Sequence, residues 1–111
     1  MTIEEVIDWL RNEAPEDRTN FGWYQGDSYR GYYDCFAVEP ADRETTIGEM
    51  ISALEDAIGQ TFEGYKGGEF TMYEDTPVFY AHYGSCGPAI TKGFLKAMFN
   101  DPDFNYMDFK E

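Results

Sequence analysis

The sequence predicts a single α+β domain over residues 1–111, with two or three helices packed on an antiparallel sheet of about four strands. Three observations predict this class. The chain of 111 residues is 42% hydrophobic and 18% aromatic, which suffices for one packed core. Two stretches carry the apolar period of amphipathic helices. Several short aromatic segments are bounded by glycine and polar residues, which is typical of strands.

The first predicted element is a helix over residues 3–13. Thr2 and Glu5 have the spacing of a capping box at its start. The apolar residues that follow share one helical face, which Trp9 extends, and Pro15 lies just beyond the expected end.

Residues 21–39 predict two strands. Aromatic and small residues alternate along this stretch, and Gly26–Asp27 is the expected turn between the strands. The second strand covers residues 29–38, where neither face is cleanly polar. One face is therefore expected to pack on helices, and the other to present tyrosines.

A second helix is predicted over residues 47–58. Thr46 and Glu49 form another capping box, an apolar stripe follows, and Gly59 ends the helix. Strands are then expected near residues 69–74 and 77–83. The short link between them, residues 75–77, predicts a hairpin of neighbouring antiparallel strands.

Residues 88–99 have two interpretations. Pro88 suits the first position of a helix and the apolar residues have near-helical spacing, but Thr91 and Gly93 weaken that pattern, so a strand is the alternative. The remaining residues predict a turn and a short aromatic strand or tail.

Charge is the dominant global property of the chain. Asp and Glu number 22 against 8 Lys and Arg, for a formal net charge of −14. Nucleic acids and anionic membranes attract proteins through Lys and Arg, so both are disfavoured as direct partners. A basic host protein or nucleoprotein complex is the favoured partner, and acidity that serves only solubility is the alternative.

Neither a membrane span nor a signal peptide is expected. The chain has no long apolar run, and its first residues are acidic where a signal peptide is basic. A cytoplasmic location is predicted, which for a phage-encoded protein is the bacterial host cytoplasm. Cys35 and Cys86 are expected to be free thiols. A single histidine and two cysteines do not supply a usual zinc site, and no cofactor is predicted.

Cys86 raises the possibility of an enzyme. The string Cys86-Gly87-Pro88-Ala89 resembles the helix start that carries the nucleophile in papain-like and bacteriocin-processing peptidases. A thiolate there is stabilised by the helix N-terminus. In those peptidases the histidine lies downstream, whereas His82, the single histidine here, lies upstream. A hydrolase or transferase that uses Cys86 and His82 is therefore the alternative to a binding protein.

The central half of the chain carries a second resemblance. The stretches "TTIGEMISALEDAIG" and "EDTPVFYAHYGSCGPAIT" resemble a pattern of small phage and prophage proteins. With its size and acidity, the chain resembles phage inhibitors of bacterial defence, the anti-CRISPR and anti-restriction proteins. That resemblance implies nucleic-acid mimicry, in which carboxylates replace phosphates in an Arg- and Lys-rich channel. A phage assembly component is a further alternative.

The acids expected in loops and turns are the candidate contacts, with exposed tyrosines beside them. Asp101 and Asp103 belong to this group if the C-terminal turn lies on the same side, whereas Glu4 is expected to be remote from it. The predicted partner-binding residues are Glu13, Glu16, Asp17, Asp27, Glu74, Asp75, Asp101, Asp103, Tyr24 and Tyr32.

Overall fold

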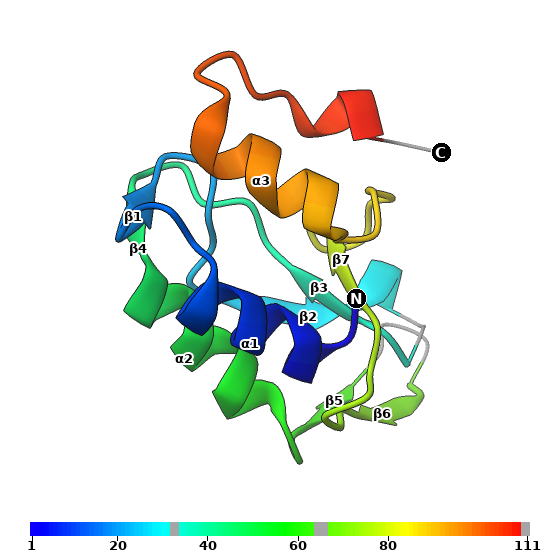
Figure 1. Cartoon of the computed structure of the whole chain (residues 1–111). Helices are drawn as coiled ribbons and strands as arrows, with labels where there is room; N and C mark the ends of the chain where they lie inside the picture. Colours follow the sequence, from blue (N-terminus) through cyan, green and yellow to red (C-terminus); the bar gives the residue numbers. More distant parts are fainter. Residues whose placement is uncertain (32–33, 64–66, 110–111) are drawn as a thin grey trace.

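Helices α1 and α2 pack against each other in a computed structural model that describes residues 1–31, 34–63 and 67–109 (Figure 1). The α+β class is confirmed, with a third helix and three small sheets in the described ranges. The elements in chain order are α1 (Ile3–Asn12), β1 (Arg18–Thr19), β2 (Gly26–Ser28), the 3-10 helix η1 (Tyr29–Gly31), β3 (Phe36–Val38), β4 (Thr45–Thr46), α2 (Ile47–Ala57), β5 (Thr61–Glu63), β6 (Glu69–Thr71), β7 (Val78–Tyr80), α3 (Lys92–Asn100) and the 3-10 helix η2 (Tyr106–Phe109).

Both predicted capping boxes are confirmed. The Glu5 N–H donates to Thr2 Oγ1 at 3.3 Å, and the Thr2 N–H donates to Glu5 Oε1 at 2.9 Å. The same two bonds join Thr46 and Glu49, at 3.1 and 3.0 Å. Gly59 follows α2 with φ +81°, a left-handed conformation that glycine adopts without steric cost, and the helix ends there as expected.

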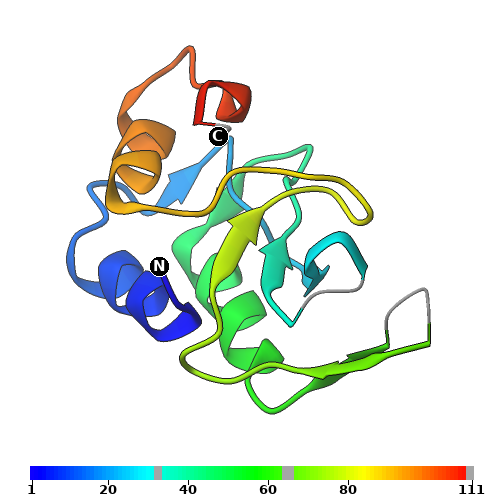
Figure 2. The ribbon, with the colours of Figure 1, turned by 90° about the vertical axis from the view of Figure 1, so that its right-hand side faces the viewer.

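The central sheet has the order β2-β3-β7. Strands β2 and β3 are antiparallel, whereas β3 and β7 are parallel, with Phe36 opposite Val78. A parallel pair needs a long crossover, and here the chain passes through α2 and the β5–β6 ribbon between the two strands. Figure 2 shows this ribbon extending away from the central sheet.

The predicted strand over residues 29–38 is wrong for most of its described residues, among which only Phe36–Val38 forms a strand, and residues 32 and 33 lie outside the described ranges. Gly26 and Asp27 are not a turn but part of β2. The chain leaves the sheet after Ser28 and enters η1, where Arg30 has a left-handed φ of +57° that is incompatible with an extended strand.

The predicted hairpin of residues 69–74 and 77–83 is also wrong. Strand β6 pairs with β5, and β7 pairs with β3. The intervening residues bind the start of α1, where the Ile3 and Glu4 N–H groups donate to the carbonyls of Thr76 and Glu74 at 2.9 and 3.0 Å. The first N–H groups of a helix have no partner within it, and this turn satisfies two of them.

Of the two interpretations of residues 88–99, the helix is confirmed from Lys92 onward, and the residues before it form an isolated bridge and no strand. Ala89 forms a bridge with Phe79, and the Ile90 N–H donates to the Val78 carbonyl at 3.0 Å. Helix α3 begins after Thr91, whose side chain accepts from the Phe94 N–H at 3.1 Å. Pro88 therefore precedes the helix, and the C-terminal aromatic segment forms η2 instead of a strand.

Aromatic side chains fill the core between the helices and the central sheet. Trp23 is fully buried and donates its indole N–H to the Met50 carbonyl at 3.1 Å. The Tyr80 hydroxyl donates to the Phe21 carbonyl at 2.6 Å, and burial raises the pKa of this tyrosine. Around this core, α1 and α3 lie in front of the central sheet in Figure 1 and to its left in Figure 2.

Candidate functional site

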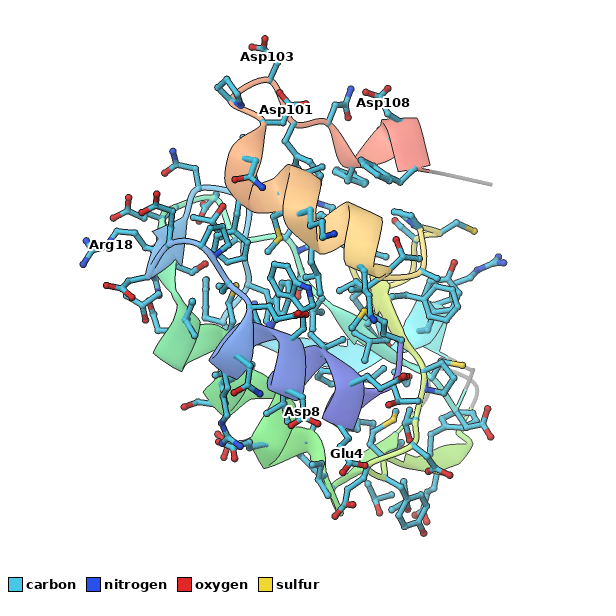
Figure 3. The ribbon with its side chains drawn as sticks, in the orientation of Figure 1. Glu4, Asp8, Arg18, Asp101, Asp103 and Asp108 are labelled. Atoms are coloured by element: carbon cyan, nitrogen blue, oxygen red, sulfur yellow. The ribbon has the colours of Figure 1, made fainter. Side chains whose placement is uncertain are left out.

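The predicted acids do not gather on one surface. Asp101 and Asp103 lie at one end of the molecule in Figure 3, and Glu4 lies at the opposite end. Glu74 is at the Glu4 end, because the Glu4 N–H donates to its carbonyl. The condition for including Asp101 and Asp103, that the C-terminal turn lies on the same side as the other acids, is therefore not met for Glu74.

The other predicted acids occupy separate places. Glu13 is the C-cap of α1, and Glu16 and Asp17 are exposed in the loop before β1. The Asp17 carbonyl accepts from the Ile47 N–H at 2.8 Å, so this loop adjoins the start of α2. Asp27 is half-buried in β2, where its carboxylate accepts from the Ser28 N–H at 2.8 Å.

Tyr24 belongs to a surface over α2 on which charges are paired. Its side chain is 41% exposed, and the Arg43 guanidinium carbon lies 4.5 Å from the ring centre. Arg43 also pairs with Glu49 at 2.7 Å. Tyr24 and Arg43 border a hollow of about 540 Å³. The other predicted tyrosine, Tyr32, lies outside the described residues.

One group of acids does come together, at the start of α1. Glu4 and Asp8 are exposed and separated by one helical turn, which places them on the same side of α1. Glu74 and Asp75 are exposed in the turn that binds the helix start. We call these four residues the acidic face. Glu4 is therefore not remote from Glu74 and Asp75, contrary to the prediction.

The carboxylates of the acidic face are not in ion pairs in the described part of the chain. Arg11, Arg18 and Arg43 pair with Glu55, Glu44 and Glu49, at 2.7, 3.1 and 2.7 Å. Within residues 1–31, 34–63 and 67–109, no Lys, Arg or His forms an ion pair with any carboxylate of the acidic face. Its carboxylates therefore remain available to a cationic partner.

Glu49, the acid of the second capping box, has a positively charged partner in Arg43. The pKa of Glu49 is lowered to about 2, chiefly by the hydrogen bond from Arg43 and then by the backbone bond from Thr46. The pKa of Glu5 is also lowered, chiefly by the backbone bond from Thr2. The hydrogen bond from Arg43 distinguishes the site of Glu49 from that of Glu5.

Cys86 does not lie at a helix start. It is exposed in the loop after β7, and α3 begins only after the N-cap Thr91. The thiol therefore lacks the helix N-terminus that the peptidase resemblance implies. His82 Nδ1 lies 3.7 Å from Glu39 Oε1, and burial raises the pKa of the Cys35 thiol.

A groove lies between α1 and α3, and the sequence analysis did not predict it. Two adjoining hollows of about 310 and 370 Å³ form it, and both are lined by Trp9, Glu13 and Lys92. In the described ranges, the groove included, no three His, Cys, Asp or Glu side chains are placed to hold a metal ion together.

Comparison of the chain with protein-family models, curated proteins and solved structures finds no match. None of the helices in the described part of the chain has the length and apolar character needed to cross a membrane.

Proposed function

We propose that this chain is a non-enzymatic inhibitor of the phage-encoded kind, which occupies a basic nucleic-acid-binding surface of a host defence complex. The observation that carries the proposal is the acidic face of Glu4, Asp8, Glu74 and Asp75, which is exposed and has no ion-pair partner in the described residues.

The charge of the acidic face suits a basic channel. Residues four apart on a helix have Cβ atoms about 5–6 Å apart. DNA presents one negative charge per about 1.7 Å of helix axis, and its binding surfaces carry rows of Arg and Lys. A compact group of carboxylates therefore attracts the cations that otherwise contact phosphates.

The backbone holds the acidic face in place. Glu4 and Asp8 lie on one helix, and the turn that carries Glu74 and Asp75 is joined to that helix by the Ile3 and Glu4 N–H groups. Charges displayed on an ordered backbone lose less conformational entropy on binding than charges on a mobile tail. This favours mimicry by the acidic face over mimicry by dispersed loop acids.

The test is displacement of DNA from candidate partners. Purified RNA-guided nuclease complexes and restriction enzymes are each bound to a fluorescently labelled duplex, and the protein is titrated while anisotropy is recorded. We expect release of the duplex from at least one partner. Release should weaken between about 0.1 and about 0.5 M salt, because screening shortens the reach of the carboxylates.

A matched pair of variants separates the acidic face from net charge. Glu74→Lys with Asp75→Lys reverses two charges in the acidic face, and Asp101→Lys with Asp103→Lys reverses two at the opposite end. The first variant should lose about 2–5 kcal/mol of binding free energy if the pair is desolvated in the complex. The second should change mainly the association rate.

Two results would contradict the proposal. Equal losses in the two variants would show that net charge alone drives binding. Simultaneous binding of the protein and the duplex to one partner, without competition, would show that the inhibitor does not occupy the nucleic-acid surface.

A further inference from the structure

The ribbon of β5 and β6 has a free edge along β6. In the described ranges the two strands pair only with each other, and β5 also contacts β2 of the central sheet. Figure 2 shows the ribbon extending away from that sheet. The side of β6 that faces away from β5 therefore has no strand paired with it in the part of the chain that the structure describes.

Backbone groups of β6 point toward this free edge. The Met72 N–H donates to the Gln60 carbonyl at 3.0 Å, and the Met72 carbonyl accepts from the Gly59 N–H at 2.7 Å, so the backbone of Met72 faces the β5 side. Backbone groups alternate in direction along an antiparallel strand. The N–H and carbonyl groups of Glu69 and Thr71 therefore point away from β5. Such an edge is a template for an added strand.

The side chains of the ribbon make one of its faces negative. Phe62 and Phe70 are half-buried and pack against the core. Side chains alternate along a strand, so the other face carries Glu63 and Glu69, which are exposed and directly opposite each other. Neither forms an ion pair within the described residues. Like charges in this position repel, and a cation on an added strand relieves the repulsion.

The free edge leads directly into the acidic face. Tyr73, Glu74 and Asp75 follow β6 in the chain, and the Tyr73 side chain is 59% exposed. A tyrosine ring beside carboxylates offers a surface for a guanidinium, as the Tyr24 ring does for Arg43 at 4.5 Å. A segment that pairs with β6 therefore continues over Tyr73 toward the carboxylates of the acidic face.

We propose that β6 accepts a strand from the partner, an extended segment with Lys or Arg at alternate residues. Its backbone pairs with Glu69 and Thr71, and its basic side chains lie on the face that carries Glu63 and Glu69. A second copy of this chain is a poorer occupant, because a net charge of −14 on each copy opposes association. The inference rests on the proposed function for the identity of the partner, and it adds the mode of binding.

Peptide binding to the intact protein tests the edge directly. The probe is a short peptide, blocked at both ends, in which Arg and Val alternate. NMR spectra recorded during its titration should show saturable shifts of the Glu69 and Thr71 amide signals. Hydrogen exchange of both amides should slow at least about tenfold in the complex. A peptide in which Glu replaces Arg should not bind, because Glu63 and Glu69 repel it.

Two N-methylated peptides separate strand pairing from charge attraction. One carries a methyl group on the backbone nitrogen of every Arg and the other on that of every Val, so their charges are equal. N–H groups alternate between the two edges of a strand, and only one set can pair with β6. One peptide should therefore bind at least about tenfold more weakly than the unmethylated probe, and the other within about twofold of it.

Matched substitutions in the ribbon give a second test. Thr61 and Thr71 are directly opposite each other, with their hydroxyl oxygens 2.8 Å apart. Thr61→Pro and Thr71→Pro each remove this hydroxyl pair and one outward N–H group, and a strand edge tolerates proline. Thr71→Pro should weaken binding of the probe at least about tenfold, because it blocks the β6 edge. Thr61→Pro, on the β5 edge, is the control and should leave the affinity unchanged.

Four outcomes would overturn the proposal. The first is the absence of saturable shifts at Glu69 and Thr71. The second is equal binding of the two N-methylated peptides, which would show attraction by charge alone. The third is equal affinity of Thr61→Pro and Thr71→Pro for the probe. The fourth is protection of the two amides in the free protein that increases with its concentration, which would show that a second copy occupies the edge.

The free edge and the proposed function can fail independently. Release of DNA from a host complex that is equally strong with the wild type and with Thr71→Pro would refute the strand and leave the inhibitor proposal intact. Binding of the probe at Glu69 and Thr71, without release of DNA from any complex, would refute the inhibitor proposal and leave the β6 edge as a site for a basic strand.

Discussion

Helices α1 and α2 begin with the same motif and have different electrostatic surroundings. Each starts at a threonine whose side chain and backbone exchange hydrogen bonds with the glutamate three residues on. At α2 that glutamate also binds Arg43, whereas the outer side of α1 carries Glu4 and Asp8 without a paired cation in the described residues. A local motif therefore starts both helices, and their distant neighbours decide the charge around them.

The largest expected effect tests whether both helices contribute equally to the core. Leu10 on α1 and Leu54 on α2 are 2% and 0% exposed. Replacing either with Ala should lower the free energy of unfolding by about 2–5 kcal/mol, measured by denaturant titration. Ser52→Ala, on the exposed side of α2, is the control and should be nearly neutral. A loss at Leu54 alone would show that α1 packs only loosely.

The capping boxes should contribute less and equally. Thr2→Ala and Thr46→Ala should each cost about 1 kcal/mol of unfolding free energy, because each leaves an N–H group of the first turn without its partner. Thr→Ser at either position retains the acceptor and serves as the control. A much smaller loss at Thr2 would show that the turn at residues 74–76 holds the start of α1 without the cap.

The response to pH should distinguish the two capping glutamates. The pKa of Glu49 is about 2 in the folded protein and 4.5 ordinarily, so its stabilisation is present above about pH 4.5 and is lost as the pH falls toward 2. Arg43→Gln should raise the pKa of Glu49, because the Arg43 hydrogen bond is the largest cause of the shift. The pKa of Glu5 should not change.

NMR titration of the two carboxyl groups in the wild type and in Arg43→Gln provides this measurement. Arg18→Gln, which breaks a different ion pair, is the control for a change of net charge. An unchanged Glu49 pKa in Arg43→Gln would show that the Thr46 backbone bond alone sets it.

The smallest effects are expected from single surface charges, and they should differ in sign. Glu55→Gln removes the partner of Arg11 and should cost about 0.2–1 kcal/mol. Asp8→Asn relieves repulsion on the acidic side of α1 and should leave stability unchanged or raise it by up to about 0.5 kcal/mol. Thermal unfolding of both variants at low salt gives the comparison. A clear loss in Asp8→Asn would mean that Asp8 has a cationic partner in solution.

The helices were predictable because their signals are local. Thr2, Thr46 and Gly59 act within one helical turn, so the expected ranges 3–13 and 47–58 differ from the observed helices by a single residue at the C-terminal end. The α+β class followed from the same signals, together with the short aromatic segments.

Strand pairing was not predictable, because it depends on neighbours that are distant in sequence. The run "VFY" at residues 78–80 identifies a strand, but nothing within it selects a parallel partner at Phe36–Val38 over the nearby residues 69–71. Backbone hydrogen bonds are alike at every residue, so the choice depends on which apolar faces fit together in the core.

The candidate sites also combine features that are local in the sequence with contacts between distant residues. The position of Glu4 and Asp8 outside the apolar stripe of α1 was readable from the sequence, but their meeting with Glu74 and Asp75 was not. Trp9 was readable only as an extension of the apolar face, whereas its unpaired N–H and the lysines opposite it appear when α1 and α3 pack. Electrostatic and hydrogen-bonding interactions depend on distance in space, so the chain must fold before its charges acquire their neighbours.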